Sequence, residues 1–283
     1  MSGDDQSALI ADLHAHTRFS DGKESPAQLM SRAKSAGVRI LAVTDHDTVT
    51  GLAESRTAAQ TAGLELIPGL ELSVRCNSVE AHIVGLWIND RDPELLKLTA
   101  MLEKGRAERA KKMVDKLAGL GARVAWKAVE KIAGPGVVGR PHVAQALVDA
   151  GQVPSFQEAF YRYIGRRGPA YAPKPVVRPE QAIAAIHAAG GVAVMAHPLV
   201  GGVQREQVAM IAEMGLDAVE VIHPKLSEAE SDWLRELARQ KGLALSGGSD
   251  WHGEGWSEGE MGRFCISREW VAELHARRRI NQA

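Results

Sequence analysis

Short apolar runs that alternate with amphipathic segments constrain the fold of this chain more than any other feature. Ser25 and Pro26 are typical of a helix start, and Gly37 of a helix end. The same pattern recurs at Arg178 and Pro179. Alternation of this kind predicts βα units that contribute strands to a largely parallel sheet. Seven runs are predicted as strands, at residues 8–14, 39–45, 64–73, 80–88, 190–197, 216–222 and 243–249.

The alternation stops between residues 95 and 176, where two or three helices replace the next strand. This part of the chain is basic, because residues 104–178 hold 15 Lys and Arg against five Asp and Glu. We therefore expect an α/β barrel formed by residues 1–95 and 176–283, with residues 96–175 as an inserted helical subdomain. A basic insertion on a barrel loop is well placed to cap an anionic substrate. An exposed basic surface without a ligand explains the charge equally well.

The composition limits the class of protein and the kinds of site it can carry. The chain has 283 residues, of which 45% are hydrophobic and 24% charged, as in ordinary globular proteins. No apolar run reaches the roughly 20 residues that span a bilayer, and the first residues lack the pattern of a secretory signal. We therefore expect a cytoplasmic protein that does not bind membranes. Cys76 and Cys265 are far apart, which disfavours a disulfide framework and a thiolate metal site.

Histidines and carboxylates gather where the predicted strands end. The C-terminal ends of barrel strands converge on one face, so we expect these side chains to meet there. Alternate residues of an extended segment face the same side, which pairs His14 with His16 and Asp250 with His252. A site of imidazoles and carboxylates suits Mn²⁺, Fe or Zn²⁺. The side chains at strand ends are His14, His16, Asp45, His46, Glu71, His197, His223, Asp250 and His252.

Other polar residues of these segments receive less specific interpretations. His82 stands at the start of its apolar run, so that strand is expected to be antiparallel or displaced. Asp21, in the loop after the first strand, is a further candidate ligand. Asp45 is expected to orient a ligand only if the strand pleat is locally broken, and Asp47 to begin a turn. His187 and His275 are expected to have no role in the site.

Six motifs spread from Asp12 to His252 resemble one known family. They are DLHAHTRFSDG, AVTDHDT, PGLELSV, AHIVGLW, MAHP and SGGSDWH. As a set they are similar to those of the polymerase and histidinol phosphatase (PHP) family of amidohydrolase-like enzymes. The resemblance implies a distorted seven-stranded (β/α)7 barrel with two or three divalent metal ions, Mn²⁺ before Mg²⁺, Fe or Zn²⁺.

The resemblance also implies which residues hold which ion. A carboxylate at Asp21 makes the second site harder, which favours Mn²⁺ or Mg²⁺ over Zn²⁺. The first ion would be held by His14, His16, Glu71 and Asp250, the second by Asp21, His46 and His252, and a third by Glu71, His82 and His197.

The motifs GRPHVAQALV, RRGPAYAP and VEVIHP narrow the resemblance within the family. They are similar to those of bacterial members that remove the 3′-phosphate of 3′,5′-nucleoside bisphosphates, such as adenosine 3′,5′-bisphosphate, to leave the 5′-monophosphate. A 5′-to-3′ exoribonuclease acting on short RNA is the first alternative, and a histidinol-phosphatase-like enzyme the second. A non-catalytic PHP module that binds nucleic acid or a polymerase is disfavoured, because all nine ligands are present. No obligate protein partner is expected.

Residues outside the ligand set are candidates for binding substrate. His223 is a candidate to protonate the leaving alkoxide, with packing or substrate binding as the alternative. Arg140 and His142 follow a GlyProGly turn, and Arg grips phosphate through two N–H donors, which suits a second phosphate. Ser78, in the loop before His82, is a candidate to donate a further hydrogen bond to substrate. Arg178 and Lys225 are weaker candidates to contact it. Tyr171 and Trp87 are aromatic candidates to stack on a base, although core packing is favoured for Trp87.

Overall fold

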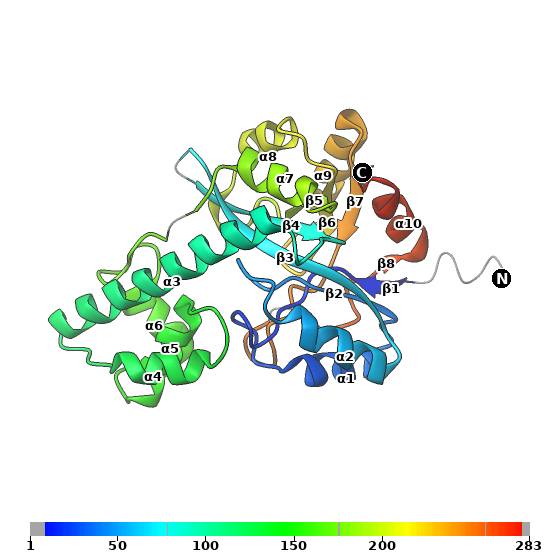
Figure 1. Ribbon diagram of the computed structural model, residues 1–283. Coiled ribbons are helices and arrows are strands. Elements are labelled where there is room, and N and C mark those ends of the chain that lie inside the picture. The colour runs from blue at the N-terminus through cyan, green and yellow to red at the C-terminus, as the bar shows by residue number, and fades with distance from the viewer. Residues whose placement is uncertain (1–8, 78, 175, 258, 279–283) are drawn as a thin grey trace.

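A single eight-stranded sheet organises the protein (Figure 1). The structure is a computed structural model that describes residues 9–77, 79–174, 176–257 and 259–278. The spatial order of the strands is β7-β6-β5-β4-β3-β2-β1-β8. The strands are β1 (Leu9–Asp12), β2 (Ile40–Val43), β3 (Glu65–Cys76), β4 (Val79–Leu86), β5 (Val192–Ala196), β6 (Ala218–Ile222), β7 (Ala244–Gly247) and β8 (Ile266–Ser267).

The sheet closes almost completely, because the first and seventh strands meet. Leu13 N–H donates to the Gly247 carbonyl over 3.2 Å, and Ala15 forms a parallel bridge with Trp251. The predicted α/β barrel is therefore confirmed. The structure adds β8, which pairs antiparallel with the start of β1 and whose two residues are too few to leave a pattern in the sequence.

Strand β4 runs antiparallel to both of its neighbours, β3 and β5. His82 pairs with Ser73 of β3 on one side and with Ala196 of β5 on the other. The start of β4 therefore lies level with the ends of the adjacent strands, as the position of His82 in its apolar run predicted.

Helices cover the outside of the barrel, and the sheet separates two apolar layers. Alternate residues of a strand face opposite sides. Ile40 therefore belongs to the cluster inside the barrel, whereas Leu41 packs with Leu29 and Ile183 of the covering helices. Ser25 caps the first helix with the predicted geometry and forms a capping box with Gln28. The covering elements are α1 (Pro26–Ser35), α2 (Leu52–Ala62), α7 (Pro179–Ala188), the 3-10 turn η3 (Val200–Gly202), α8 (Arg205–Ala212), α9 (Glu228–Lys241) and α10 (Arg268–Ala276).

A helical segment replaces the expected βα unit between β4 and α7. Figure 1 shows α3 running away from the barrel, with α4, α5 and α6 beside its far end. These helices have their own apolar cluster, which includes Leu117, Val129, Val143 and Leu147. The division into barrel and insertion stays a prediction that this separate core supports. The elements are α3 (Pro93–Gly119), α4 (Trp126–Ala133), α5 (Arg140–Asp149), α6 (Phe156–Ala159) and the π-helical turn η2 (Phe160–Ile164). Among the described residues, no helix is long and apolar enough to cross a membrane.

Candidate metal centre

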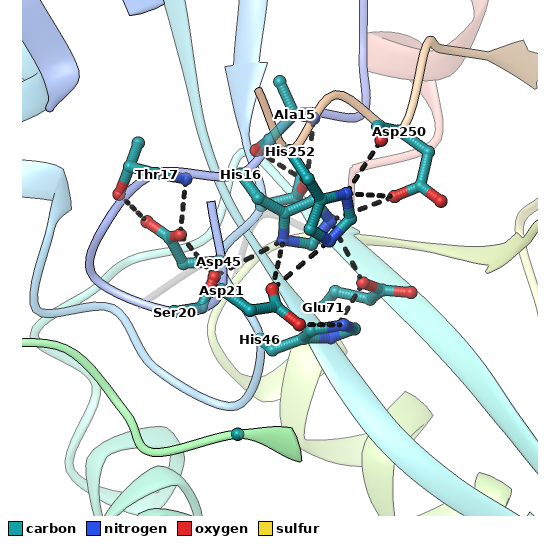
Figure 2. A network of polar contacts seen from close by, with 12 residues as sticks. Ala15, His16, Thr17, Ser20, Asp21, Asp45, His46, Glu71, Asp250 and His252 are labelled. Carbon is teal, nitrogen blue, oxygen red and sulfur yellow. Dashed lines mark hydrogen bonds and ion pairs between the residues drawn. The ribbon is translucent and has the colours of Figure 1, made fainter. Parts of the chain in front are cut away.

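The structure brings all nine predicted ligands together at one end of the barrel. His14, His16 and Asp21 follow β1, and His46 follows β2, where it forms a parallel bridge with Glu71 of β3. Figure 2 shows the side chains of His16, Asp21, His46, Glu71, Asp250 and His252 directed toward one another. The nine residues form four overlapping groups, and within each group one ligand atom per residue lies within 4.8 Å of the others: His16, Asp21, His46 and His252; His14, His16 and Asp250; His14, Glu71 and His197; and His46, Glu71 and His82.

Glu71 lies in the middle of this centre and is fully buried. Its Oε1 lies 2.7 Å from His82 Nδ1 and 2.9 Å from His197 Nε2. Its Oε2 lies 2.8 Å from His46 Nδ1 and 3.3 Å from His16 Nε2. His14 Nε2 also lies 3.4 Å from Oε2. One carboxylate that faces five rings from four chain segments has the arrangement of a bridging ligand.

Several ligand atoms have no protein partner with hydrogen-bond geometry. Among the described residues, Asp21 Oδ1, His46 Nδ1 and Glu71 Oε2 are buried without a hydrogen bond. His14 Nε2 and His16 Nε2 lie 3.1 Å apart. Buried polar atoms are normally satisfied, so unsatisfied carboxylate oxygens beside converging ring nitrogens fit bound divalent cations. The donor set contains only nitrogen and oxygen.

The backbone is strained at the ligands themselves. Two ligand residues have positive φ without being glycine, His197 at 27° and Asp250 at 50°. Side chains other than glycine adopt this region at a cost of about 1–3 kcal/mol, and such residues concentrate at functional sites. The strain aims both side chains into the centre from the strand ends.

Glu220 of β6 is a further member of the centre that sequence reasoning missed. Its Oε1 lies 2.7 Å from His14 Nδ1, and its other oxygen accepts the His197 backbone N–H over 2.5 Å. The contact leaves His14 Nε2 free to face the ligands, as carboxylates behind metal-binding histidines generally do. Burial raises the pKa of Glu220, but His14 outweighs it and holds the pKa below its usual range. The available signal was a carboxylate inside the apolar run AVEVI.

Asp45 has a different role from the one expected, because it supports the loop between His16 and Asp21. Its oxygens accept hydrogen bonds from Thr17 N–H at 2.8 Å, Thr17 Oγ1 at 2.6 Å and Ser20 Oγ at 2.6 Å (Figure 2). Burial raises its pKa to about 6 in spite of these bonds. Asp45 therefore shapes the loop that carries ligands and contacts no ligand ring directly.

Asp47 lies in a turn, as expected, but its side chain has a further role. Asp47 is fully buried and accepts hydrogen bonds from Ser73 N–H at 2.7 Å and Ser73 Oγ at 2.9 Å. It also forms an ion pair with Arg106 of α3, and Lys174 donates to Ser73 Oγ over 2.6 Å. The insertion is thus joined to the barrel beside His46. The signal for Arg106 was its place in the buried stripe of α3 with Leu102, Arg109 and Met113.

Two cavities open onto the centre. The first, of about 170 Å³, is lined by Asp21, Pro141, Phe156, His223, Pro224, Lys225, Ser249, Asp250, His252, Trp256 and Ser257. The second, of about 260 Å³, contains Arg140, Arg166 and Glu80 beside His46, His82 and His197. Lys225, Asp250 and His252 line both cavities, which therefore meet at the ligands.

The predicted substrate-binding residues are distributed unevenly. His223 and Arg140 reach the cavities. Among the described residues lining them, His142 and Arg178 are absent. His142 Nδ1 instead accepts the Gly139 N–H over 2.9 Å at the start of α5, and Arg178 is exposed at the start of α7. Ser78 lies outside the described residues.

The remaining candidates have partners of their own. Trp87 packs edge-on against His275, with ring centroids 5.3 Å apart. His187 contacts Asp217 over 2.6 Å. Tyr171 directs its hydroxyl to Glu80 over 3.4 Å and lines a separate cavity with Arg75 and Arg166. These contacts account for Trp87, His187 and His275 by packing, whereas Tyr171 lies beside the second cavity.

We expect metal binding to release protons and to strengthen as the pH rises from about 6.5 to about 9. Burial disfavours the charged form of His252, but Asp21 and Asp250 outweigh it and raise its pKa to about 9. Likewise Glu220, Glu71 and Asp250 overcome burial at His14, whose pKa lies well above 6.5. The raised pKa favours the protonated form of both rings in the absence of metal, and each ring must release that proton to bind metal. Mn²⁺ calorimetry in two buffers of different ionisation enthalpy measures this release. Affinity independent of pH, with no proton release, would contradict it.

Comparison with known proteins places this centre in a family. The PHP domain model matches residues 12–133. The chain is 38% identical to the 5′-3′ exoribonuclease Rnm of Escherichia coli (strain K12), over 87% of this chain and 86% of that protein. It is 33% identical to the 3′,5′-nucleoside bisphosphate phosphatase of Chromobacterium violaceum, over 94% of this chain and 96% of that protein.

Two solved structures share the whole fold. One, from Bifidobacterium adolescentis and assigned as a metal-dependent phosphoesterase, has a TM-score of 0.89 at 30% identity and covers 96% of this chain and 97% of its own. The other is an amidohydrolase from Chromobacterium violaceum with bound SO4. It has a TM-score of 0.85 at 32% identity, and the match covers 97% of this chain and 99% of that structure. The chain therefore belongs to the PHP-domain family and is a hydrolase of phosphate esters.

Proposed function

We propose that this protein removes the 3′-phosphate of 3′,5′-nucleoside bisphosphates to leave the 5′-monophosphate. The observation that carries the proposal is the second cavity, in which two arginines face the same space as five predicted ligands. A substrate with one phosphate at the ligands can place another phosphate against Arg140 and Arg166. The relative from Chromobacterium violaceum bears the name of this activity.

The proposal includes two or three divalent ions, Mn²⁺ foremost, held by the nine ligands. Bound there, such ions supply Lewis acidity to the phosphate oxygens and to the attacking water. The protein's part is to hold the ester in place and to supply a proton to the leaving oxygen.

His223 is placed to supply that proton. Its Nδ1 accepts the Lys225 backbone N–H over 3.1 Å, so in the neutral ring the proton is on Nε2. Nε2 lies 3.4 Å from Asp250 Oδ2, beside a predicted ligand. To protonate the alkoxide as the ester bond breaks, the ring must first become the imidazolium by taking a proton on Nδ1 in place of the Lys225 hydrogen bond. It then passes the Nε2 proton to the alkoxide and remains as a neutral ring.

The charges around the second cavity suit an anion. Burial raises the pKa of Glu80, but Lys174 and Arg166 outweigh it and hold the pKa at about 2. Glu80 is therefore ionised, and Arg75 contacts it over 3.2 Å and Arg166 over 3.4 Å. One carboxylate among several cations leaves an excess of positive charge for a phosphate dianion.

The alternative function is 5′-to-3′ cleavage of short RNA, which relatives at 37–38% identity are named for. The same Mn²⁺-supplied preparation should be offered adenosine 3′,5′-bisphosphate, histidinol phosphate and a short 5′-phosphorylated RNA. We expect inorganic phosphate from the bisphosphate at the highest rate. Mononucleotides from the RNA without inorganic phosphate from the bisphosphate would replace the proposal by the exoribonuclease. Cytoplasmic location and the absence of an obligate protein partner stay predictions.

Arg140→Ala should lower kcat/KM for adenosine 3′,5′-bisphosphate by about 10- to 100-fold, the usual effect of losing a hydrogen bond to a charged group. The loss on a simple aryl phosphate should be several-fold smaller, because that substrate has no second phosphate. Arg178→Ala is the matched control, since Arg178 is exposed and outside both cavity linings. Steady-state kinetics on both substrates measure the effect. Equal losses on the two substrates would remove Arg140 from this role.

A further inference from the structure

The first cavity ends in a pair of aromatic rings from two different parts of the chain. Phe156, at the start of α6 in the insertion, stacks on Trp256, in the loop after β7. Their ring centroids are 4.6 Å apart and the rings are inclined by 29°. Pro141 and Pro224 complete an apolar wall that faces the ligands Asp21, Asp250 and His252. We propose that Phe156 and Trp256 form the subsite that binds the base of the nucleotide by stacking, a proposal that rests on the function proposed above.

The position of the two cavities supports this assignment. They share Lys225, Asp250 and His252, so a phosphate held at the ligands lies at their junction. One branch leads to Arg140 and Arg166, and the other leads to the aromatic pair. A nucleoside bisphosphate has three parts that need a place, the scissile phosphate, the second phosphate and the base. The junction and the two branches accommodate all three.

Core packing accounts for part of the Phe156 contacts, because Phe156 packs against the apolar cluster of the insertion, but it does not account for Trp256. Both rings are partly exposed, and within the described part of the chain Trp256 belongs to none of the three apolar clusters. The backbone around Trp256 is specialised, because Gly253 and Gly255 have φ of 111° and 76°, which other residues rarely adopt. The loop therefore holds an incompletely buried tryptophan in a defined place.

The same loop is fixed to a predicted ligand. Ser257 Oγ accepts hydrogen bonds from the backbone N–H groups of His252 over 2.6 Å and Gly253 over 3.1 Å. Lys23 Nζ lies 4.7 Å from the centroid of the Trp256 ring. These contacts set the distance from the ring to the ligands, as a subsite next to a reacting phosphate requires.

The subsite should accept any base. Ser257 is the hydroxyl nearest Trp256 in the described sequence, and its oxygen is already engaged by the two backbone N–H groups. Stacking alone tolerates every base, because each has an aromatic face. We therefore expect adenosine, guanosine, cytidine and uridine 3′,5′-bisphosphates to differ in kcat/KM by less than about ten-fold.

The test compares a substrate with a base and one without. Trp256→Ala and Phe156→Ala should each lower kcat/KM for adenosine 3′,5′-bisphosphate by about ten-fold or more, the order of effect that one lost stack produces. The loss of kcat/KM should be at least five-fold smaller on an abasic analogue that keeps the sugar ring and the same two phosphates but has hydrogen in place of the base. Trp256→Phe should restore most of the activity on the nucleotide. Trp233→Ala is the control, since Trp233 lies on α9 against Arg205, outside both cavity linings.

A binding measurement separates this proposal from the proposed function. Calorimetry with the Mn²⁺-loaded protein should show that Trp256→Ala weakens adenosine 5′-monophosphate about ten-fold and ribose 5-phosphate much less. This result does not depend on which ester is hydrolysed, so failure of every bisphosphate to release phosphate would overturn only the proposed function. If the variants lose as much affinity and kcat/KM for ligands without a base as for ligands with one, the ring pair instead serves as a structural contact between the insertion and the barrel. No loss in either variant would also overturn the base subsite.

Discussion

Glu71→Gln should lower phosphate-ester hydrolysis by roughly 10³-fold or more and reduce the metal content of the purified protein. Divalent ions contribute several kcal/mol to stabilising the reacting phosphate, and each 1.36 kcal/mol is a factor of ten in rate. Glutamine keeps the volume of the side chain but removes the charge that faces His14, His16, His46, His82 and His197. Its amide nitrogen would also turn donor hydrogens toward ring nitrogens that need an acceptor or a cation.

The matched control for this change lies on the same strand. Glu65 begins β3 at the other end of the barrel, is exposed and pairs with Arg268 over 3.9 Å. Glu65→Gln should keep full activity and metal content. Elemental analysis after dialysis and steady-state kinetics with added Mn²⁺ measure both proteins. Full metal content and full turnover in Glu71→Gln would refute the bridging role of Glu71.

Arg106→Ala should lower the free energy of unfolding by about 3–5 kcal/mol, as removal of one partner of a buried ion pair generally does. Arg106 is 5% exposed and Asp47 is fully buried, so the variant removes the cation that contacts this buried carboxylate. Burial raises the pKa of Asp47, but Arg106 and Lys174 outweigh it and lower the pKa from 3.8 to about 2. The stabilisation from Asp47 is thus present above about pH 4 and is lost as the pH falls toward 2.

The loss of unfolding free energy in Arg106→Ala should accordingly be largest above about pH 4 and become smaller between pH 4 and 2. Urea unfolding at several pH values measures it. Lys112→Ala, on the exposed side of the same helix, is the control and should change stability by less than about 0.5 kcal/mol. The double variant Asp47→Asn with Arg106→Met should recover part of the loss, because neither buried charge is then left alone. A loss of unfolding free energy no larger than that of Lys112→Ala would show that the ion pair between Asp47 and Arg106 contributes no stability.

Much of the centre follows from local patterns in the sequence. Strand ends are visible as the points where apolar runs stop, and barrel topology brings those points to one face. For that reason His14, His46 and Asp250 were predicted without knowledge of their contacts. The place of His82 in its run predicted that β4 is antiparallel or displaced, and the structure shows that it is antiparallel.

Residues that act through distant partners were not predicted. Glu220 contacts His14 across 206 positions of sequence, and Arg106 contacts Asp47 across 59. A carboxylate in a strand or an arginine on a helix has no local pattern that names its partner. Only the closure of the barrel, which brings β6 near the end of β1, and the packing of α3 on the barrel create these contacts.

The aromatic residues show the same limit more clearly. Trp87 follows β4, whose antiparallel direction carries its end away from the ligands, and there it packs on His275. Phe156 and Trp256 had no distinguishing pattern in the sequence. They lie 100 positions apart along the chain, yet their rings meet beside the predicted ligands.

The sequence by itself determined the barrel, the family and the nine predicted ligands, because each depends on short-range periodicity and on motifs at strand ends. The tertiary structure decided how the insertion is joined to the barrel, which carboxylate supports His14, and how the two cavities branch from the ligands. These features depend on side chains from separate segments that approach within a few ångströms, and such distances are set only when the layers pack.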